Sequence, residues 1–237
     1  MKMTAKHFFV KAALTLGLVL PFAAQGQSDE NIPTINFQTV PITTAIQNLA
    51  QMANLNYIIN PKLFVAADGT MKPEPALTLH WQNCTAANAL ARVLKENHLV
   101  MVTNAFTTVA CITGTNAVAN PVDAKLLGDD TNGVIPIIRF GDAPIDIVLK
   151  DIIEHDHLKV VLDPEVSGEG PPQVVYPEGP GAPPPEPSDF KVTMRPTVSV
   201  NWHNLTARQV VVELCEVYGL VIVKGSSPDS VVIKYRK

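Results

Sequence analysis

An internal repeat is the feature of this sequence that most limits what it can fold into. Two stretches of the chain align with two later stretches without a gap, the first at an offset of 103 residues and the second at an offset of 121. The pairs at the first offset include Phe37 with Phe140, Pro41 with Pro144, Leu55 with Leu158, and Pro61 with Pro164. The pairs at the second offset include Leu79 with Val200, Trp81 with Trp202, Asn83 with Asn204, and Thr85 with Thr206. Because this period is too long for a solenoid, we expect a duplicated domain.

The two offsets differ by 18 residues, which places an insertion inside the second copy. The stretch 167–189 holds eight prolines and is typical of a flexible or polyproline-like loop. We therefore divide the chain into a first domain over 33–113, a linker over 114–133, and a second domain over 134–236 with its insertion over 167–190. The insertion is either a tolerated surface loop or a docking peptide for a partner groove.

The apolar pattern of each copy predicts the order β-α-β-β-α-β-β. Ile35 and Phe37 alternate with polar residues as in a strand, and Pro41 suits the first position of a helix. After a short strand, the copy continues with a strand over 77–81 and a helix that begins after Thr85. The final hairpins are expected over 99–102 with 107–112, and over 220–223 with 231–235. The sequence therefore predicts an α+β fold, with two helices packed on small sheets in each copy.

Matched polar and aromatic positions support the same reading. Thr85 predicts a helix N-cap, and Thr206 with Gln209 forms the pattern of a capping box. Each threonine also ends an Asn-x-Thr sequence, which we interpret as turn-and-cap chemistry rather than as a glycosylation site. Trp81 and Trp202 are expected to fill equivalent places in two cores rather than to act as exposed binding anchors.

The first 26 residues have the form of a secretory signal peptide. Three lysines flank or precede an apolar run over 12–24, and Ala24 and Gly26 form an Ala-x-Gly cleavage site. The run is shorter than the roughly 20 residues needed to span a bilayer, so we expect cleavage rather than anchoring. We therefore place the mature protein in the periplasm, with no membrane span after cleavage.

The charge of the chain argues against two classes of partner. The formal net charge is −4, and residues 1–26 hold three lysines and no acidic residue, so the mature chain carries −7. An acidic protein without a basic patch is poorly suited to nucleic acid or to an anionic membrane.

The sequence contains no Gly-x-Ser-x-Gly, no phosphate-binding loop and no His-Glu-x-x-His. The nearest approach to a metal site is Glu154-His155-Asp156-His157, at a helix end where neighbouring side chains point apart. The matched stretch of the first copy, 51–54, offers no metal ligands, so we interpret this sequence as a solvated helix end. His80 and His203 are expected on strand surfaces. We predict no catalytic, cofactor-binding or metal-binding residues, and no cofactor.

Three cysteines have two interpretations. In an oxidising compartment one pair could form a disulfide, and Cys84 with Cys111 is then the expected pair, because both lie in the first copy. Alternatively Cys84, Cys111 and Cys215 are three small buried apolar side chains, which is the interpretation that we favour.

The sequence of both copies resembles the secretin and TonB short N-terminal domain. In the first copy the resemblance rests on Ile-Asn-Phe-Gln-Thr-Val-Pro-Ile at 35–42, Asn-Tyr-Ile-Ile-Asn-Pro at 56–61, Leu-Thr-Leu-His-Trp-Gln-Asn-Cys-Thr at 77–85, and Leu-Val-Met-Val at 99–102. In the second copy it rests on 138–145, 198–206 and 219–223. The resemblance implies a domain at the periplasmic end of a secretin pore or a TonB-dependent receptor. Such domains bind other envelope proteins or pack side by side in rings, and they carry no catalytic residues.

The sequence departs from that family after the second domain. Neither the long pore region of a secretin nor the plug and barrel of a receptor follows it. We therefore expect a non-enzymatic, exported interaction protein, an adaptor or accessory of envelope secretion or transport that binds envelope proteins and is open to self-association. The alternative is a periplasmic protein that binds a small ligand or cell-wall glycan, suggested by the export signal and the paired Trp residues. A metal-dependent enzyme using His155 and His157 has the least support.

Overall fold

The computed structural model of the chain describes residues 31–66, 70, 72–116, 120–128, 133–168, 196–226 and 230–236. The expected signal peptide and nearly all of the proline-rich insertion lie outside the described residues. The predicted α+β class is confirmed, because short helices and small sheets alternate along the described chain. Within this part of the chain, no helix is both long and apolar enough to cross a membrane.

The first half of the chain contains two helices and two small sheets. Strands β1 and β3 form an antiparallel ribbon, and the second sheet has the order β2-β5-β4, with β2 parallel to β5. The elements are β1 Ile32–Pro41, α1 Ile42–Met52, β2 Tyr57–Ile59, β3 Ala76–Cys84, α2 Ala86–Glu96, β4 Leu99–Thr103 and β5 Ala110–Gly114.

The second half has the same arrangement of paired strands. Strands β6 and β8 form the antiparallel ribbon, and the other sheet has the order β7-β10-β9, with β7 parallel to β10. The elements are β6 Val134–Pro144, α3 Ile145–His155, β7 Val160–Leu162, α4 Pro164–Ser167, β8 Thr197–Thr206, α5 Ala207–Tyr218, β9 Leu220–Lys224 and β10 Val231–Tyr235. Two short helices were not expected: α4, directly before the insertion, and the 3-10 helix η1, Ala124–Leu127, in the linker.

The two ribbons have corresponding strand registers. Trp81 lies opposite Ile35, and Trp202 lies opposite Ile138. Each ribbon also contains an irregularity directly after its phenylalanine, between 37 and 40 in the first and between 140 and 143 in the second. The offsets of 103 and 121 residues thus relate paired positions of the ribbons as well as the sequences.

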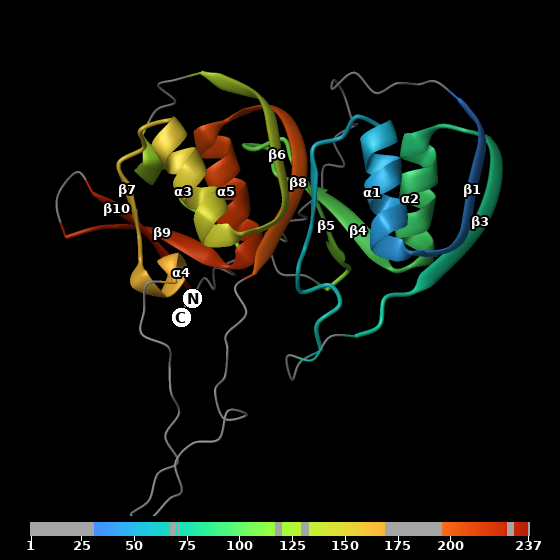
Figure 1. The fold of residues 1–237 in the computed structure, drawn as a ribbon, viewed down its shortest axis with the longest axis horizontal. Helices are drawn as coiled ribbons and strands as arrows, with labels where there is room; N and C mark the ends of the chain where they lie inside the picture. The colour runs from blue at the N-terminus through green and yellow to red at the C-terminus, as the bar shows by residue number, and fades with distance from the viewer. Residues whose placement is uncertain are drawn as a thin grey trace, which may run out of the picture.

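Each ribbon curves around one pair of helices, α1 with α2 and α3 with α5 (Figure 1). The apolar face of α1 is buried, with Ile42, Ala45, Ile46 and Leu49 almost without exposed surface. Pro41 is the N-cap of this helix and Ile42 its first residue, so the helix begins one residue later than we expected. The ribbon and the three-stranded sheet of each half thus enclose a helical pair.

The helix caps agree with the sequence prediction. The Thr85 hydroxyl accepts a hydrogen bond from the Asn88 backbone N–H at 3.2 Å. Thr206 and Gln209 form the capping box, in which each side chain accepts a backbone N–H of the other residue, at 3.2 and 2.9 Å. Asn83 and Asn204 have φ angles of 50° and 55°, a left-handed conformation that asparagine tolerates well and that explains the Asn-x-Thr pattern as a turn before each helix.

The hydrophobic cores are not separated at the boundary between the halves. One buried cluster lies within the first half, and the other fills the second half and also includes Ile58 and Val109 of the first. The linker contributes as well, because Leu127 of η1 is buried in the same cluster. The two halves therefore share a packed interface.

Candidate interaction site

The second half docks on the first through β8 and α5, and this interface provides the candidate functional site. Strand β8 lies beside β2, and the indole Nε1 of Trp202 donates a hydrogen bond to the backbone carbonyl of Tyr57 at 2.7 Å. Trp202 is fully buried. We call the β8–α5 surface the docking face, formed by Trp202, His203, Gln209, Glu213 and Glu216. The surface that it contacts is the receiving face, formed by Asn56, Tyr57, Ile58, Asn104, Thr107 and Val109.

Asn56 holds the strand of the docking face by its backbone. Its Oδ1 accepts the backbone N–H of His203 at 2.8 Å, and its Nδ2 donates to the backbone carbonyl of the same residue at 2.8 Å. A carboxamide places its acceptor oxygen and its donor nitrogen side by side. It can therefore bind both the N–H and the C=O of one residue at a strand edge, as a neighbouring strand would. The Asn56 side chain is buried, which makes both bonds important for the interface.

Helix α5 presents two carboxylates to the first half. The Thr107 hydroxyl donates to Glu213 Oε2 at 2.5 Å, and the Asn104 Nδ2 donates to Glu216 Oε2 at 2.7 Å. The backbone N–H of Val122, in the linker, donates to the other oxygen of Glu216 at 3.3 Å. All three donors are uncharged, so the two carboxylates are bound without a cation among these contacts.

Burial sets the protonation of this site. Glu213 is 1% exposed. Burial raises the pKa of Glu213 to about 7, the Thr107 hydrogen bond opposes this, and the neighbouring charge of Glu216 adds to it. The pKa of the nearby Cys111 thiol is raised to about 12 by burial and then by the charges of Glu213 and Glu216. Near neutral pH, Glu213 is therefore divided between its neutral and charged forms.

Two further residues at the start of α5 join the interface to the linker. Gln209, already part of the capping box, donates from Nε2 to the backbone carbonyl of Phe106 at 2.8 Å. The guanidinium of Arg208 donates to the carbonyl of Ala124 at 2.6 and 3.0 Å and lies 5.2 Å from the centre of the Phe106 ring. The N-terminus of the helix is thus fixed by the first half as well as by its own cap.

The same surface of the first half is open. The residues that correspond to the docking face at the offset of 121 are Trp81, Gln82, Asn88, Arg92 and Lys95. Four of them are exposed, and Trp81 is only half-buried, whereas its counterpart Trp202 is fully buried. Both Trp residues pack against a core, as expected, but Trp81 lies at the margin of the first core and Trp202 is fully enclosed in the second, because only one ribbon is covered by a neighbouring half.

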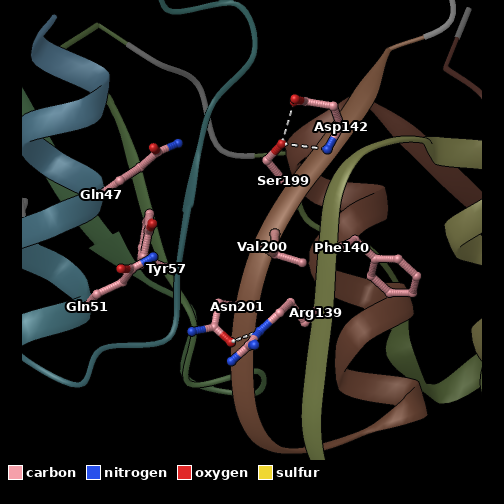
Figure 2. A pocket seen from close by; sticks show the side chains of 9 residues that line it. All are labelled: Gln47, Gln51, Tyr57, Arg139, Phe140, Asp142, Ser199, Val200 and Asn201. Atoms are coloured by element: carbon pink, nitrogen blue, oxygen red, sulfur yellow. Dashed lines mark hydrogen bonds between the residues drawn. The ribbon is translucent and has the colours of Figure 1, made fainter.

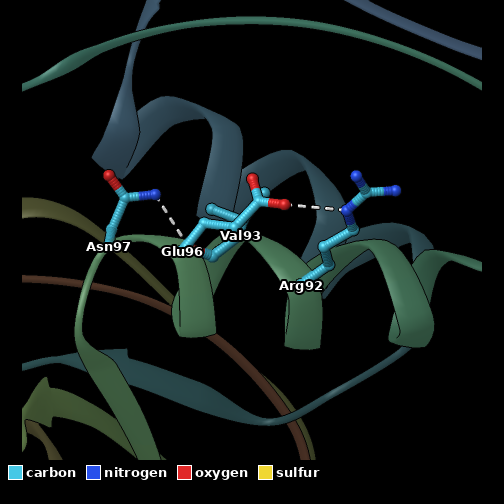
Figure 3. A network of polar contacts seen from close by, with 4 residues as sticks. All are labelled: Arg92, Val93, Glu96 and Asn97. Atoms are coloured by element: carbon cyan, nitrogen blue, oxygen red, sulfur yellow. Dashed lines mark hydrogen bonds and ion pairs between the residues drawn. The ribbon is translucent and has the colours of Figure 1, made fainter.

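Arg92 packs against the ring of Trp81 on this open face. Its guanidinium carbon lies 4.6 Å from the centre of the Trp81 ring. Its Nε also forms an ion pair with Glu96 at 2.8 Å across one turn of α2 (Figure 3). The Arg92 side chain is 58% exposed, so this pair is a weak surface interaction that a partner can displace at small cost.

The second half carries the counterpart of the receiving face at its far end. The offsets place Lys159, Val160 and Val161 where the first half has Asn56, Tyr57 and Ile58. Val161 is 58% exposed, whereas Ile58 is 2% exposed. In Figure 1, β7 and β10 lie at one end of the molecule and β1 and β3 at the other. The halves are therefore arranged head to tail, with one docking face and one receiving face left uncovered.

A polar cleft of about 550 Å³ opens beside the interface, between α1 and the β6–β8 ribbon. Figure 2 shows Gln47, Gln51 and Tyr57 facing Asn201 and the β8 strand across this cleft. The Arg139 Nε donates to Asn201 Oδ1 at 3.3 Å, and the Ser199 hydroxyl donates to Asp142 Oδ1 at 2.7 Å. Burial raises the pKa of Tyr57, an effect opposed by its hydrogen bond with Gln51. A smaller cleft of about 250 Å³ adjoins it and shares Gln47, Tyr57 and Ser199.

The candidates from the sequence lie elsewhere. Glu154, His155 and His157 are exposed at the end of α3, while Asp156 is buried. In the part of the chain that the structure describes, no group of three or more His, Cys, Asp or Glu side chains is arranged to hold a metal ion. His80 is exposed on β3, and the backbone of His203 belongs to the interface.

The cysteines are three free thiols. Cys215 is fully buried, while Cys84 and Cys111 are half-buried. The Cys84 thiol donates to the Thr85 backbone carbonyl at 3.4 Å. The structure thus agrees with the interpretation of the cysteines as small packed side chains: Cys215 lies in the interior, and Cys84 and Cys111 lie at its margin.

Comparison of the chain with protein-family models, with curated proteins and with solved structures found no match. The resemblance to the secretin and TonB short N-terminal domain therefore stays a prediction. Sequence reasoning missed the interface residues Asn56, Glu213 and Glu216. The sequence held a signal for α5 alone: three consecutive valines precede Glu213, which is more apolar surface than one buried stripe of a helix requires.

Proposed function

We propose that this chain is an exported, non-catalytic interaction module built from two copies of a domain like the secretin and TonB short N-terminal domain. It acts as an adaptor or accessory in envelope secretion or transport, with one or more envelope proteins as partners. The duplication, the export signal and the resemblance of both copies support this function.

One observation carries the proposal: the first half exposes the counterpart of the face through which the second half binds it. A surface that corresponds in position to one half of a packed, hydrogen-bonded interface is well placed to contact another protein, with the partner set by its own charges. Trp202 and Asn56 anchor the existing contact. Buried Trp side chains are among the few residues that contribute most of the binding energy in many interfaces.

The test uses the mature full-length chain as immobilised bait in solubilised envelope extract of cells that produce it. We expect envelope proteins to be retained in a saturable manner and released by an excess of the free chain. The matched bait is the same chain after thermal denaturation, which removes the folded surface but keeps the composition. Retention of the same proteins by both baits, or of none by the folded chain, would contradict the proposal.

The cleft between α1 and β8 favours a second candidate, a binding protein for a polar small ligand such as a cell-wall glycan. Amide, guanidinium and hydroxyl groups line it, and these are the groups that recognise polar ligands. Soluble peptidoglycan fragments should then perturb the NMR signals of Gln47, Gln51 and Asn201, and Arg139→Ala should weaken the effect. An unchanged spectrum at millimolar fragment would exclude this candidate.

A further inference from the structure

We propose that the open docking face of the first half binds a partner protein with an acidic receiving face, and that the chain's own free receiving face is excluded from it. This inference rests on the proposed role as an interaction module and names the partner chemistry for it. The face in question consists of Trp81, Gln82, Asn88, Arg92 and Lys95.

The interface inside the chain specifies what such a partner must offer. Trp202 needs a free backbone carbonyl, which Tyr57 supplies, and His203 needs a group that both accepts and donates, which the Asn56 carboxamide supplies. Gln82 lies opposite Thr34 as His203 lies opposite Ile137. Because antiparallel pairs alternate in the direction of their backbone groups, the N–H and C=O of Gln82 point away from β1 in the same way. Trp81 and Gln82 therefore require an open strand with a carboxamide side chain.

Charge separates the two docking faces. Where the second half presents the carboxylates of Glu213 and Glu216, the first half presents Arg92 and Lys95. Thr107 and Asn104 act as hydrogen-bond donors to Glu213 and Glu216. A guanidinium or an ammonium group can only donate, so it cannot form the same hydrogen bonds. A partner for this face must offer acceptors, and carboxylates give the strongest hydrogen bonds to these two groups.

The chain's own free receiving face fails on both requirements. Lys159 stands in the place of Asn56, and an ammonium group cannot accept the backbone N–H of Gln82. Lys159 and Lys224 are both exposed. Lys224 corresponds to Thr103, the neighbour of the Asn104 that contacts Glu216, so a second copy docked in this way would add two positive charges to a face that already holds Arg92 and Lys95. Like charges at such an interface oppose the contact. Head-to-tail association of one copy of the chain with another is thus disfavoured, whereas binding of an acidic partner to the open docking face is favoured.

Full-chain variants can turn the free receiving face into a probe of the required chemistry. The variant K159N/K224E gives that face a carboxamide and removes two positive charges in exchange for one negative charge. Sedimentation velocity at low salt should show the wild-type chain as a monomer and the variant as concentration-dependent oligomers, with association at least tenfold tighter. Adding R92E/K95E, or separately W81A, should return the variant to a monomer, and circular dichroism should confirm that each variant is folded.

Three results would overturn the inference. One is a K159N/K224E chain that is as monomeric as the wild type. Another is oligomers that persist in both the R92E/K95E and the W81A backgrounds. The third is a wild-type chain that self-associates and loses this association on Trp81→Ala. Failure here is distinguishable from failure of the proposed function, because the bait experiment retains envelope proteins whichever surface they use. If R92E/K95E leaves that retention unchanged, the interaction module stands and the assignment of its surface falls.

Discussion

The indole of Trp202 donates to the backbone carbonyl of Tyr57 at 2.7 Å, which joins the ribbon of the second half to the edge strand of the first. Trp81, at the corresponding position of the other ribbon, is half-buried and lies beneath Arg92 instead. The same residue in the same register therefore has two roles, one inside an interface and one beside an open surface.

Truncation of the two Trp residues should have unequal effects on stability. Trp202→Ala removes a fully buried side chain and should lower the free energy of unfolding by about 3–5 kcal/mol. Trp81→Ala removes a half-buried side chain at the surface and should cost about 1–2 kcal/mol. Urea unfolding followed by circular dichroism measures both, and Trp202→Phe separates loss of the hydrogen bond from loss of volume. Equal costs for the two alanine variants would contradict the arrangement.

Asn56→Ala should destabilise the contact between the halves. It removes two hydrogen bonds and leaves the N–H and C=O of His203 without their partner in a partly buried place, at a cost of about 2–3 kcal/mol. Hydrogen exchange at the His203 amide should accelerate in the same variant. Asn116→Ala, at an exposed position, is the matched control and should change neither quantity. An unaltered His203 amide in Asn56→Ala would show that the side chain does not hold the strand.

Glu213 should make stability fall as pH rises from about 4.5 to about 7. The native state keeps a proton on this buried carboxyl that the unfolded chain has released, so the native state is favoured at the acidic side of this window. The loss across the window is of the order of 3 kcal/mol at most. Glu213→Gln mimics the neutral form and should be more stable than the wild type at pH 8, with the difference vanishing near pH 4.5.

The control variant for this pH effect is Glu154→Gln, which removes an exposed carboxyl at the end of α3. Denaturant unfolding of the three proteins at pH 4.5, 6, 7 and 8 gives the required curves. If Glu213→Gln and the wild type keep a constant difference across this range, Glu213 does not titrate in the interface as we infer.

The three cysteines should differ in reactivity. Cys215 is fully buried and burial raises its pKa, so a thiol reagent should reach it only when the protein unfolds. Cys111 is half-buried with a raised pKa and should react slowly. Cys84 lies at the end of β3 and should react first. Timed alkylation of the reduced protein with peptide mass spectrometry gives the order, and early labelling of Cys215 would contradict the packing of α5.

Much of the fold follows from the repeat in the sequence. The order of strands and helices, the N-cap at Thr85 and the capping box of Thr206 with Gln209 were all predictable, because each depends on local patterns. The short helices α4 and η1 were not predicted. Leu127 in η1 is buried only because the second half lies beside it, and a linker sequence rich in Asn, Asp and Gly gives little sign of that contact.

The candidate site was harder to foresee for a physical reason. Alignment of the copies places Trp81 with Trp202 and Arg92 with Glu213, but it does not say which face is covered by another half. Trp202 and His203 are hydrogen-bonded to Tyr57 and Asn56, which lie some 145 residues earlier in the chain. Relative to α2, α5 carries more apolar residues and has Glu213 and Glu216 in place of Arg92 and Lys95. These differences reflect the contact, and they can be interpreted only when the two halves are compared position by position.

The unequal exposure of the two Trp residues can be measured directly with single-Trp proteins. Trp81→Phe leaves Trp202 as the only indole, and Trp202→Phe leaves Trp81. The arrangement of the halves predicts blue-shifted emission and little quenching by acrylamide for Trp202, and red-shifted, readily quenched emission for Trp81. Equal quenching of the two proteins, both folded by circular dichroism, would contradict a structure in which one docking face is covered and the other is open.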